Sequence, residues 1–448
     1  MRSWRESLRP VRMDRIAVVV PADRMRAVLV RLAAAGVVEF DGPAPSPAPE
    51  AVLSALPPPA TGRPELLAGE EALRARSRAS TSRDGVSAIA GWAPADRVRS
   101  LSGDLACVDG AVVVLPRPRG VEVPSMLRAG GVRGSLKSLV ETYGTVPYRD
   151  VDPTPLAAAA FLLMFGMMFG DVGHGALLLL IAAALAFWPR LRRFRRAWPF
   201  AAGAGLAGMV FGALYGEFFG PTGVLPALWL RPMERPVALM VAAVFVGAVL
   251  LAGAQTLGTV NRVREAGWRA ALYASSGIAG VALLVGLAVV VAGGYAGLVL
   301  PVVLGAVLAS LGMVLIFVGF TGEGGVFEAC VELFDTVLGL GSNVASFTRL
   351  AAFGLTHTAL GWIVWEGTRA LWPRGTTGVA GAAAVFVAGN LLAFALEGLV
   401  VAIQALRLEY YELFSRVFQS QGRPFRPWRL PVVTEEVAPW PRGSPASH

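Results

Sequence analysis

Polar side chains recur along the last long apolar segment of the sequence at heptad spacing. They are Asn390, Glu397, Gln404 and Tyr411. On one α-helix this spacing forms a single polar stripe that drifts by only about 20° per heptad. The stripe either joins helices through hydrogen bonds or carries function, because ionisable groups such as Glu397 at membrane depth pair or line a water-filled path. Arg407 lies one turn beyond Gln404, displaced to the side.

A second apolar segment, residues 346–365, carries an arginine and a histidine. Arg349 lies near its start and His357 follows eight residues later. An arginine at the centre of a membrane helix costs about 2.5 to 3.5 kcal/mol on insertion scales, so Arg349 needs a partner or a water path. The structural alternatives are an Arg349 that extends to the membrane interface and a His357 that is a hydrogen-bonded packing residue.

Motifs for nucleotide and metal chemistry are missing from the sequence. The only lysine, Lys137, is preceded by no glycine-rich phosphate loop, so we expect no ATP site on this chain. The three histidines, His174, His357 and His448, form no HExxH motif and no local cluster. We therefore expect neither a metal nor a cofactor.

The composition indicates an integral membrane protein. Of 448 residues, 55% are hydrophobic and 16% charged, and the mean hydropathy is +0.58, which lies outside the range of soluble domains. The net charge of +9 comes mostly from arginines between apolar runs, where they set membrane orientation. We expect a membrane lipid environment and no nucleic-acid partner.

The apolar run from Pro155 to Trp188 has 34 residues. As one helix it would be about 50 Å long, against roughly 30 Å of hydrocarbon. Its middle, residues 170–175, is rich in glycine, so we expect two short helices that meet near residues 170–173. The arginines at 190–196 and 262–269 then mark the cytoplasmic side.

Six further spans complete an eight-span bundle. We expect an amphipathic cytoplasmic helix at 323–342, two long tilted C-terminal helices, and both chain termini in the cytoplasm of a multi-pass cell-membrane protein. The six spans are predicted at about 198–219, 237–259, 270–293, 297–320, 344–372 and 377–414.

Residues 1–150 indicate a small cytoplasmic α+β domain. Strand, helix and strand patterns follow one another at 14–20, 21–36 and 37–40, and again at 86–92, 94–106 and 111–116. This repeat predicts a ferredoxin-like sheet. Residues 41–85 form a linker in which 64–83 could be one charged helix. The fold class is thus mostly α, with a membrane domain at 151–418 and a basic cytoplasmic tail at 419–448.

Four segments of the sequence resemble, in order, the subunit a (subunit I) family of V-type and A-type rotary ATPases. The GWAP element at 91–94 is similar to the end of that family's cytoplasmic arm. The four segments are VETYGTVPYRDVDPTP (140–155), MFGMMFGDVGHG (164–175), SNVASFTRLAAFGLTH (342–357) and LEGLVVAIQALRLEYYELFSRVF (396–418).

The resemblance implies a stator that couples proton or sodium translocation to rotation. Arg349 would face the ion-carrying carboxylate of the rotor ring and keep two aqueous half-channels apart. The other family positions divide between the half-channels. The outer one would contain His357, Glu397 and Arg407, and the cytoplasmic one Asp171 and Asp335.

The implied partners are a rotor ring of small two-helix membrane subunits, central-stalk and peripheral-stalk subunits and, indirectly, the ATPase head. The family's long coiled-coil arm is replaced here by residues 41–85, which places the peripheral-stalk contact in question. Two other functions stay open. One is a secondary transporter in which Arg349 and Glu397 bind a small charged solute, and the other is an assembly protein that translocates no ions.

Overall fold

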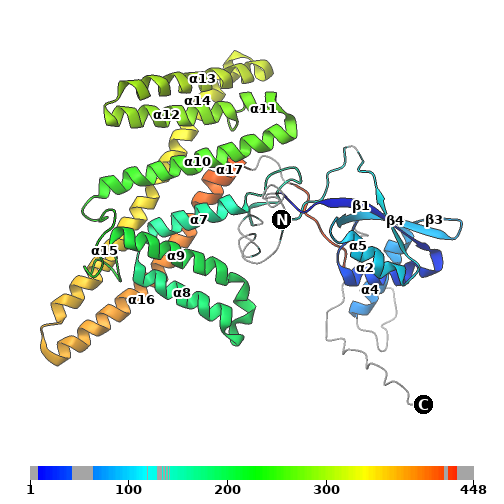
Figure 1. Ribbon diagram of the computed structural model, residues 1–448, viewed down its shortest axis with the longest axis horizontal. Helices are drawn as coiled ribbons and strands as arrows, with labels where there is room; N and C mark the ends of the chain where they lie inside the picture. Colours follow the sequence, from blue (N-terminus) through cyan, green and yellow to red (C-terminus); the bar gives the residue numbers. More distant parts are fainter. Residues whose placement is uncertain are drawn as a thin grey trace. The chain divides into compact units, whose positions relative to one another are not determined.

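The computed structural model describes residues 9–42, 64–118, 120–128, 134, 137, 140, 142–417 and 422–430. These residues form two compact units (Figure 1). One contains residues 11–126 together with 423–430, and the other contains residues 9–10 and 127–422. Residues 43–63 of the predicted linker and most of the predicted basic tail lie outside the described residues.

The smaller unit is an antiparallel sheet with helices, as the sequence predicts. The strand order is β2-β4-β1-β5, and β3 pairs with the first three residues of β4. The elements in chain order are β1 (Met13–Pro21), η1 (Ala22–Arg24), α2 (Met25–Ala35), β2 (Glu39–Phe40), α4 (Pro64–Arg78), β3 (Thr81–Arg83), β4 (Val86–Pro94), α5 (Val98–Ala106) and β5 (Ala111–Leu115).

The core of this unit follows from the period-two pattern of β1. Ile16, Val18 and Val20 are each about 1% exposed because alternate residues of a strand point to one face. They pack in one cluster with Leu29 of α2 and Leu101 of α5. Both helices therefore cover the same face of the sheet.

The prediction of one helix over 64–83 is wrong at its end. Helix α4 stops at Arg78, and β3 pairs with β4 through a two-residue turn. The turn residues Asp84 and Gly85 have φ angles of 51° and 79°. Asp-Gly is favoured in such hairpins, because both central residues need positive φ.

Residues 423–430 belong to the smaller unit although they follow the last helix of the chain. The Trp428 N–H donates to Val38 O at 2.8 Å, and the Trp428 ring lies edge-on to Phe40 at 5.4 Å. Arg423 forms an ion pair with Glu39. The first part of the predicted tail is thus packed on strand β2.

The larger unit is helical. Its elements are α7 (Thr154–Met168), α8 (Val172–Phe187), η2 (Pro189–Ala197), α9 (Trp198–Tyr215), α10 (Pro236–Ala266), α11 (Trp268–Tyr273), α12 (Ile278–Ala296), α13 (Val299–Gly324), α14 (Val326–Ser346), α15 (Thr348–Leu371), α16 (Gly375–Leu408), the π-helix η3 (Glu409–Phe414) and α17 (Ser415–Val417).

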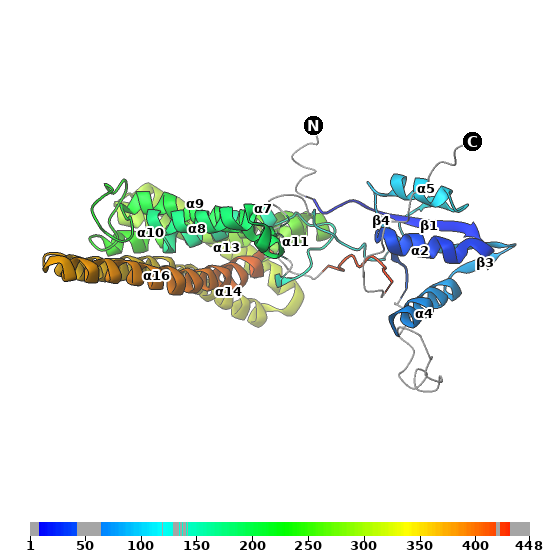
Figure 2. The same cartoon turned by 90° about the horizontal axis from the view of Figure 1, so that it is seen from below.

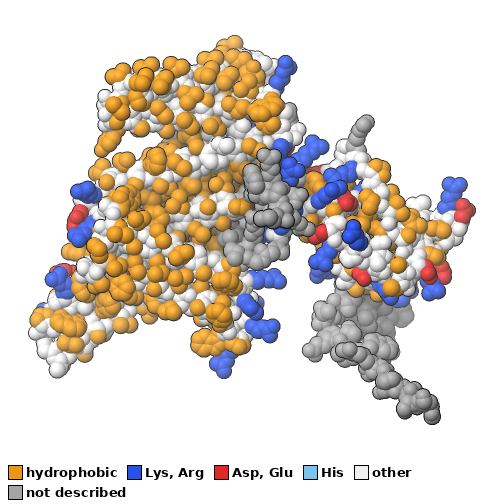
Figure 3. All heavy atoms as spheres, in the orientation of Figure 1, with side chains coloured by type: hydrophobic (Ala, Val, Ile, Leu, Met, Phe, Trp, Pro, Cys, Tyr) orange, Lys and Arg blue, Asp and Glu red, His pale blue; other side chains and the backbone are white. Residues whose placement is uncertain are grey.

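Helical hairpins organise this unit: α8 packs on α9, α12 on α13 and α15 on α16. Glycines permit a close contact between α8 and α9, since a Cβ on Gly205 of α9 would lie 2.8 Å from the carbonyl oxygen of Gly175 in α8. In Figure 2, α16 lies in a layer beside α8, α9 and α10. Figure 3 shows that apolar side chains cover most of the visible face of this unit.

Within the part of the chain that the structure describes, five helical stretches are long and apolar enough to cross a membrane, so the predicted count of eight spans is not confirmed. The predicted break near residues 170–173 is confirmed, because α7 and α8 are separate apolar helices of 15 and 16 residues. The five stretches are Pro189–Tyr215, Pro236–Glu265, Trp268–Ala296, Val299–Gly322 and Gly375–Val417.

Candidate functional site

The start of helix α8 is built around a buried carboxylate. Asp171 is 0% exposed and accepts three backbone N–H bonds, from His174 at 2.9 Å, Phe219 at 3.0 Å and Gly220 at 2.7 Å. It is therefore both the N-cap of α8 and the anchor of the loop after α9. Gly173 leaves room for this loop, because a Cβ there would lie 2.5 Å from the Phe219 ring.

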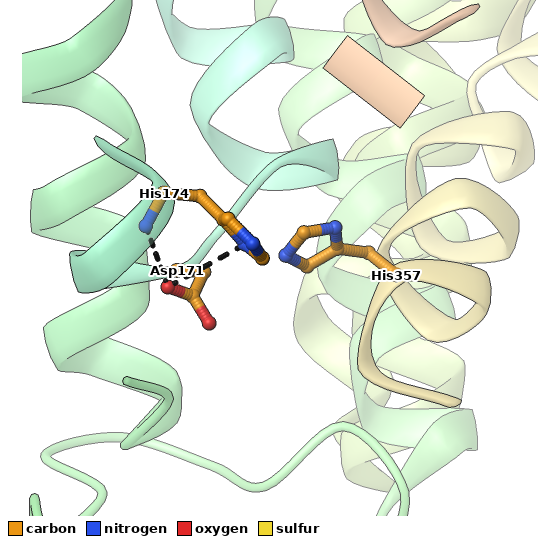
Figure 4. A group of neighbouring side chains, drawn as sticks. All are labelled: Asp171, His174 and His357. Atoms are coloured by element: carbon orange, nitrogen blue, oxygen red, sulfur yellow. Dashed lines mark hydrogen bonds and ion pairs between the residues drawn. The ribbon is translucent and has the colours of Figure 1, made fainter. Parts of the chain in front are cut away.

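Two histidines from distant parts of the sequence meet beside Asp171 (Figure 4). His174 Nδ1 lies 3.7 Å from Asp171 Oδ1, and the His174 and His357 ring centroids are 5.4 Å apart. His357 Nδ1 in turn contacts the carboxylate of Glu397 on α16 through a short hydrogen bond. We call Asp171, His174, His357 and Glu397 the histidine cluster.

The histidine cluster is enclosed by the protein. His174 is 1% and His357 4% exposed. The centroid of the Phe169 ring lies 5.8 Å from that of His174 and 5.0 Å from that of His357. Glu217, 2% exposed, lies beside His357 and Thr358. Glu217 is not among the predicted site residues, although a glutamate in the apolar stretch YGEFFG at the end of the predicted span 198–219 was a usable signal.

The predicted polar stripe of α16 is present for its first three members. Among the described residues, one side-chain oxygen each of Asn390, Glu397 and Gln404 is enclosed and has no hydrogen-bond partner. Buried oxygens of this kind are ordinarily bonded to water. Tyr411, the predicted fourth member, is 71% exposed, so that part of the prediction is wrong.

The stripe continues at Glu412 because of the π-helix Glu409–Phe414. A π-turn contains one extra residue per turn, which moves the next inward position from 411 to 412. Glu412 Oε1 accepts from Arg349 Nη2 at 3.1 Å, and Arg349 Nε donates to Ser346 O at 2.9 Å. The predicted arginine therefore has a partner that the heptad count did not find.

Two further polar residues surround Glu412. In the amide orientation that satisfies its neighbours, Asn343 donates to Glu412 Oε2 at 3.0 Å and accepts from Arg416 at 2.8 Å. The Arg349 side chain is 24% exposed and that of Glu412 is 9% exposed. We call Asn343, Arg349, Glu412 and Arg416 the arginine cluster.

The structure does not bring all predicted site residues into these two clusters. Arg407 is exposed, and no hydrogen bond or ion pair joins it to another described residue. Asp335 is exposed on α14, close enough to influence Arg416. Asp171, predicted on the cytoplasmic side, instead lies with His357, which was predicted on the outer side.

A buried acid also lies where the chain enters α7. Asp150 is 3% exposed, and burial, together with the nearby Glu265 carboxylate, raises its pKa from 3.8 to about 7 against the opposing effect of Arg264. The next residue, Val151, donates its N–H to Asn261 Oδ1 of α10 at 3.0 Å. This polar junction fixes the start of α7 against the end of α10.

These features define a helical integral membrane protein with buried ionisable clusters and a small α+β unit. The sequence model of the V-type ATPase 116kDa subunit family matches residues 87–197. A-type ATP synthase subunit I of Aeropyrum pernix is 30% identical over 379 residues, covering 72% of this chain and 53% of the relative.

Other relatives have corresponding names. A-type ATP synthase subunit I of Pyrococcus horikoshii is 24% identical over 364 residues, 77% of this chain and 54% of the relative. V-type ATP synthase subunit I 2 of Treponema pallidum is 35% identical over 147 residues, 29% of this chain and 32% of the relative. The chain belongs to the V/A-type ATPase subunit I family, and it spans about half the length of the A-type relatives it matches.

Proposed function

We propose that this chain is the stator subunit of a V/A-type rotary ATPase and that it carries protons or sodium ions past a rotor ring. The observation that carries the proposal is the arrangement of the hairpin α15–α16, which holds a partly exposed Arg349 and a buried His357–Glu397 pair. Their eight-residue separation on α15 corresponds to about 12 Å along the helix. Two ion-handling sites on one hairpin are what two half-channels require.

The outer half-channel would pass through the histidine cluster. Its buried oxygens on Asn390, Glu397 and Gln404 support a hydrated path, because they have no protein partner among the described residues. We assign Asp171 to this half-channel rather than to the cytoplasmic one, since it lies next to His174 and His357. Arg407 would contribute from the exposed flank of α16.

The cytoplasmic half-channel would begin on α14. Asp335 is exposed there and acts on Arg416, which belongs to the arginine cluster. An ion entering beside Asp335 would thus approach the rotor on the side of Arg349 away from the histidine cluster. A fixed guanidinium charge between the two paths would block a direct leak.

Glu412 would serve as the resting counter-ion of Arg349. A guanidinium remains charged at all physiological pH values, and Glu412 Oε1 accepts a hydrogen bond from it. A rotor carboxylate reaching Arg349 would replace Glu412, lose its ion and move on, after which Glu412 would pair with Arg349 again. This exchange would keep Arg349 from binding any one rotor carboxylate permanently.

The partners proposed for this function are a ring of small two-helix subunits facing α15 and α16, the central and peripheral stalks, and the ATPase head through them. The soluble unit would be the attachment to the stalks. Only residues 41–85 separate its two halves in the sequence, so we propose a shorter contact with the peripheral stalk than in the relatives.

ATP-driven ion pumping in vesicles that contain the assembled complex tests this function. Arg349→Ala is expected to abolish pumping and Arg349→Lys to leave little of it, because an ammonium cannot reproduce the planar fork of donors. Arg407→Ala, the matched control, is expected to reduce pumping only partly.

Assembly is verified separately by co-purification of the other subunits. If assembled Arg349→Ala complexes pump at the wild-type rate, the stator function is excluded for this chain and the assembly function gains support. If the isolated chain instead takes up a charged solute, the transporter function replaces it.

A further inference from the structure

The histidine cluster has the donor set of a metal site. Asp171, His174 and His357 each offer one ligand atom, and the three atoms lie within 4.8 Å of one another. All three side chains are at most 4% exposed. Figure 4 shows the imidazole of His357 facing that of His174, with the Asp171 carboxylate next to His174.

His174 has nitrogens available for a ligand. Within the described residues neither ring nitrogen makes a hydrogen bond of normal geometry. The nearest polar groups are the Asp171 carboxylate, 3.7 Å from Nδ1, and the backbone of Asn390. An enclosed imidazole without hydrogen bonds is costly, and a bound cation removes this cost.

His357 is oriented for ligation by the carboxylate behind it. Its Nδ1 contacts Glu397, which leaves Nε2 on the side of His174 and Asp171 (Figure 4). Metal-binding histidines nearly always donate their other ring N–H to a carboxylate, which fixes the tautomer and raises ligand basicity. Glu397 would have this role here.

We propose that the histidine cluster binds one zinc-like divalent cation, with Asp171, His174 and His357 as ligands and Glu397 as the orienting partner of His357. Two imidazoles and a carboxylate match Zn²⁺ and related transition ions, whereas Mg²⁺ and Ca²⁺ take oxygen ligands. This site is not predictable from the sequence, because its histidines, His174 and His357, are 183 positions apart.

A bound cation would fix the start of α8 to α15 and occupy His357. If the cluster belongs to the outer half-channel, as the proposed function has it, the cation would also stop ion flow. The site would then be an inhibitory zinc site. Binding itself does not rest on the proposed function, and only the inhibition does.

The first experiment measures binding of ZnCl₂ to the purified full chain in detergent by equilibrium dialysis and metal analysis. Wild type is expected to bind one Zn²⁺ per chain, and His174→Gln to lose this binding. Glu397→Gln should weaken it by about 10–100-fold, the usual effect of losing an orienting partner. His448→Gln, which removes the third histidine of the chain, is the matched control and should bind as wild type does.

X-ray absorption at the zinc edge of the wild-type chain is expected to show two imidazole ligands, and Zn²⁺ should raise the melting temperature of wild type but not of His174→Gln. Equal binding by wild type and His174→Gln, or a spectrum without imidazole, overturns the site. The spectrum uses wild type, so it decides the question even if a variant fails to fold.

The second experiment adds Zn²⁺ from the outer side to pumping vesicles. Inhibition of wild type that is lost in His174→Gln places the site in the ion path. Binding without inhibition removes the site from the ion path and contradicts the outer half-channel, but leaves the zinc site in place. Inhibition without binding at this cluster overturns the site alone.

Discussion

At the scale of single residues, the ion pair between Arg349 and Glu412 sets the orientation of the Arg349 guanidinium. Both side chains are more than three-quarters buried, at 24% and 9% exposure, so the pair is less screened than a surface salt bridge. Ser346 O and Asn343 hold the two partners in place. The arginine is therefore already oriented for the proposed encounter with a rotor carboxylate.

Replacing Glu412 by Gln tests this counter-ion role. In the proposed exchange nothing would then compete with the rotor carboxylate for Arg349, so its release should slow. Pumping should fall by about 10- to 150-fold, which corresponds to about 1.5 to 3 kcal/mol for hydrogen bonds to charged groups. The measurement is ATP-driven pumping by assembled vesicles. Glu366→Gln, an exposed acid on α15, serves as the control and should pump normally.

Unchanged pumping by Glu412→Gln would show that the pair is only structural. A complete loss equal to that of Arg349→Ala would also contradict the exchange model, because Glu412 would then be required for the chemistry itself. A Glu412→Asp variant separates charge from reach, since it retains the carboxylate on a side chain shorter by one methylene.

Residue chemistry was predictable from the sequence where it followed a regular helix. Asn390, Glu397 and Gln404 obey the heptad, and Arg349 and His357 stand out as costly groups in apolar helices. The position of Glu412 was not predictable in this way, because the π-helix Glu409–Phe414 changes the register of the inward-facing residues and no local sequence pattern indicates a π-helix there. The meeting of His174 with His357 depends on tertiary packing, which periodicity alone cannot give.

At the scale of elements, helix length and polar content explain why fewer than eight helices are both long and apolar enough to be recognised as membrane spans in the described residues. Helices α7 and α8 have only 15 and 16 residues, because the apolar run is divided between Phe169, which follows the last residue of α7, and Asp171, which caps the start of α8. Helix α15 is not among the long apolar stretches, since its charged and polar site residues lower its hydropathy. The site residues of α15 thus lower the hydropathy by which this helix would be recognised as a membrane span.

The junction between α7 and α10 makes a prediction about pH. Asp150 has a pKa of about 7 in the folded chain against 3.8 ordinarily, so between these values the folded state binds a proton that the unfolded state has lost. The stability contributed by the protonated acid therefore falls as the pH rises through this window, and its loss is complete above about pH 7.

Asp150→Asn, which resembles the protonated acid, should melt at a higher temperature than wild type at pH 8, and by a smaller margin at pH 5. The measurement is thermal unfolding of the purified chain in detergent at both pH values. The exposed Asp335→Asn should show no such change of margin. A margin that grows toward low pH would contradict the buried-acid explanation.

At the scale of the whole chain, the smaller unit is completed by residues from both ends of the sequence. Glu39 on β2 is 8% exposed because residues 423–430 cover it, through the Arg423 ion pair and the Arg426 N–H at 2.6 Å. A glutamate in the predicted strand VVEF gave no sign of a partner almost 400 positions later. The sheet was predictable from strand periodicity, and its C-terminal segment was not.

Trp428→Ala tests whether this C-terminal segment stabilises the smaller unit. The indole packs on Phe40, whereas the backbone N–H of Trp428 that donates to Val38 O is kept in the alanine variant. Because the side chain is only partly buried, the loss should be about 1 to 2 kcal/mol, below the 3 to 5 kcal/mol of a fully buried tryptophan. The expected result is faster amide hydrogen exchange at residues 37–41, where the segment meets β2.

Trp268→Ala, which truncates a 71% exposed tryptophan in the other unit, is the control and should leave exchange at residues 37–41 unchanged. Glu39→Gln should speed exchange in the same segment, because Arg423 would lose its charged partner. If neither Trp428→Ala nor Glu39→Gln changes the exchange, residues 423–430 do not stabilise the sheet. The smaller unit would then fold without residues 423–430, and this segment would be free to make other contacts.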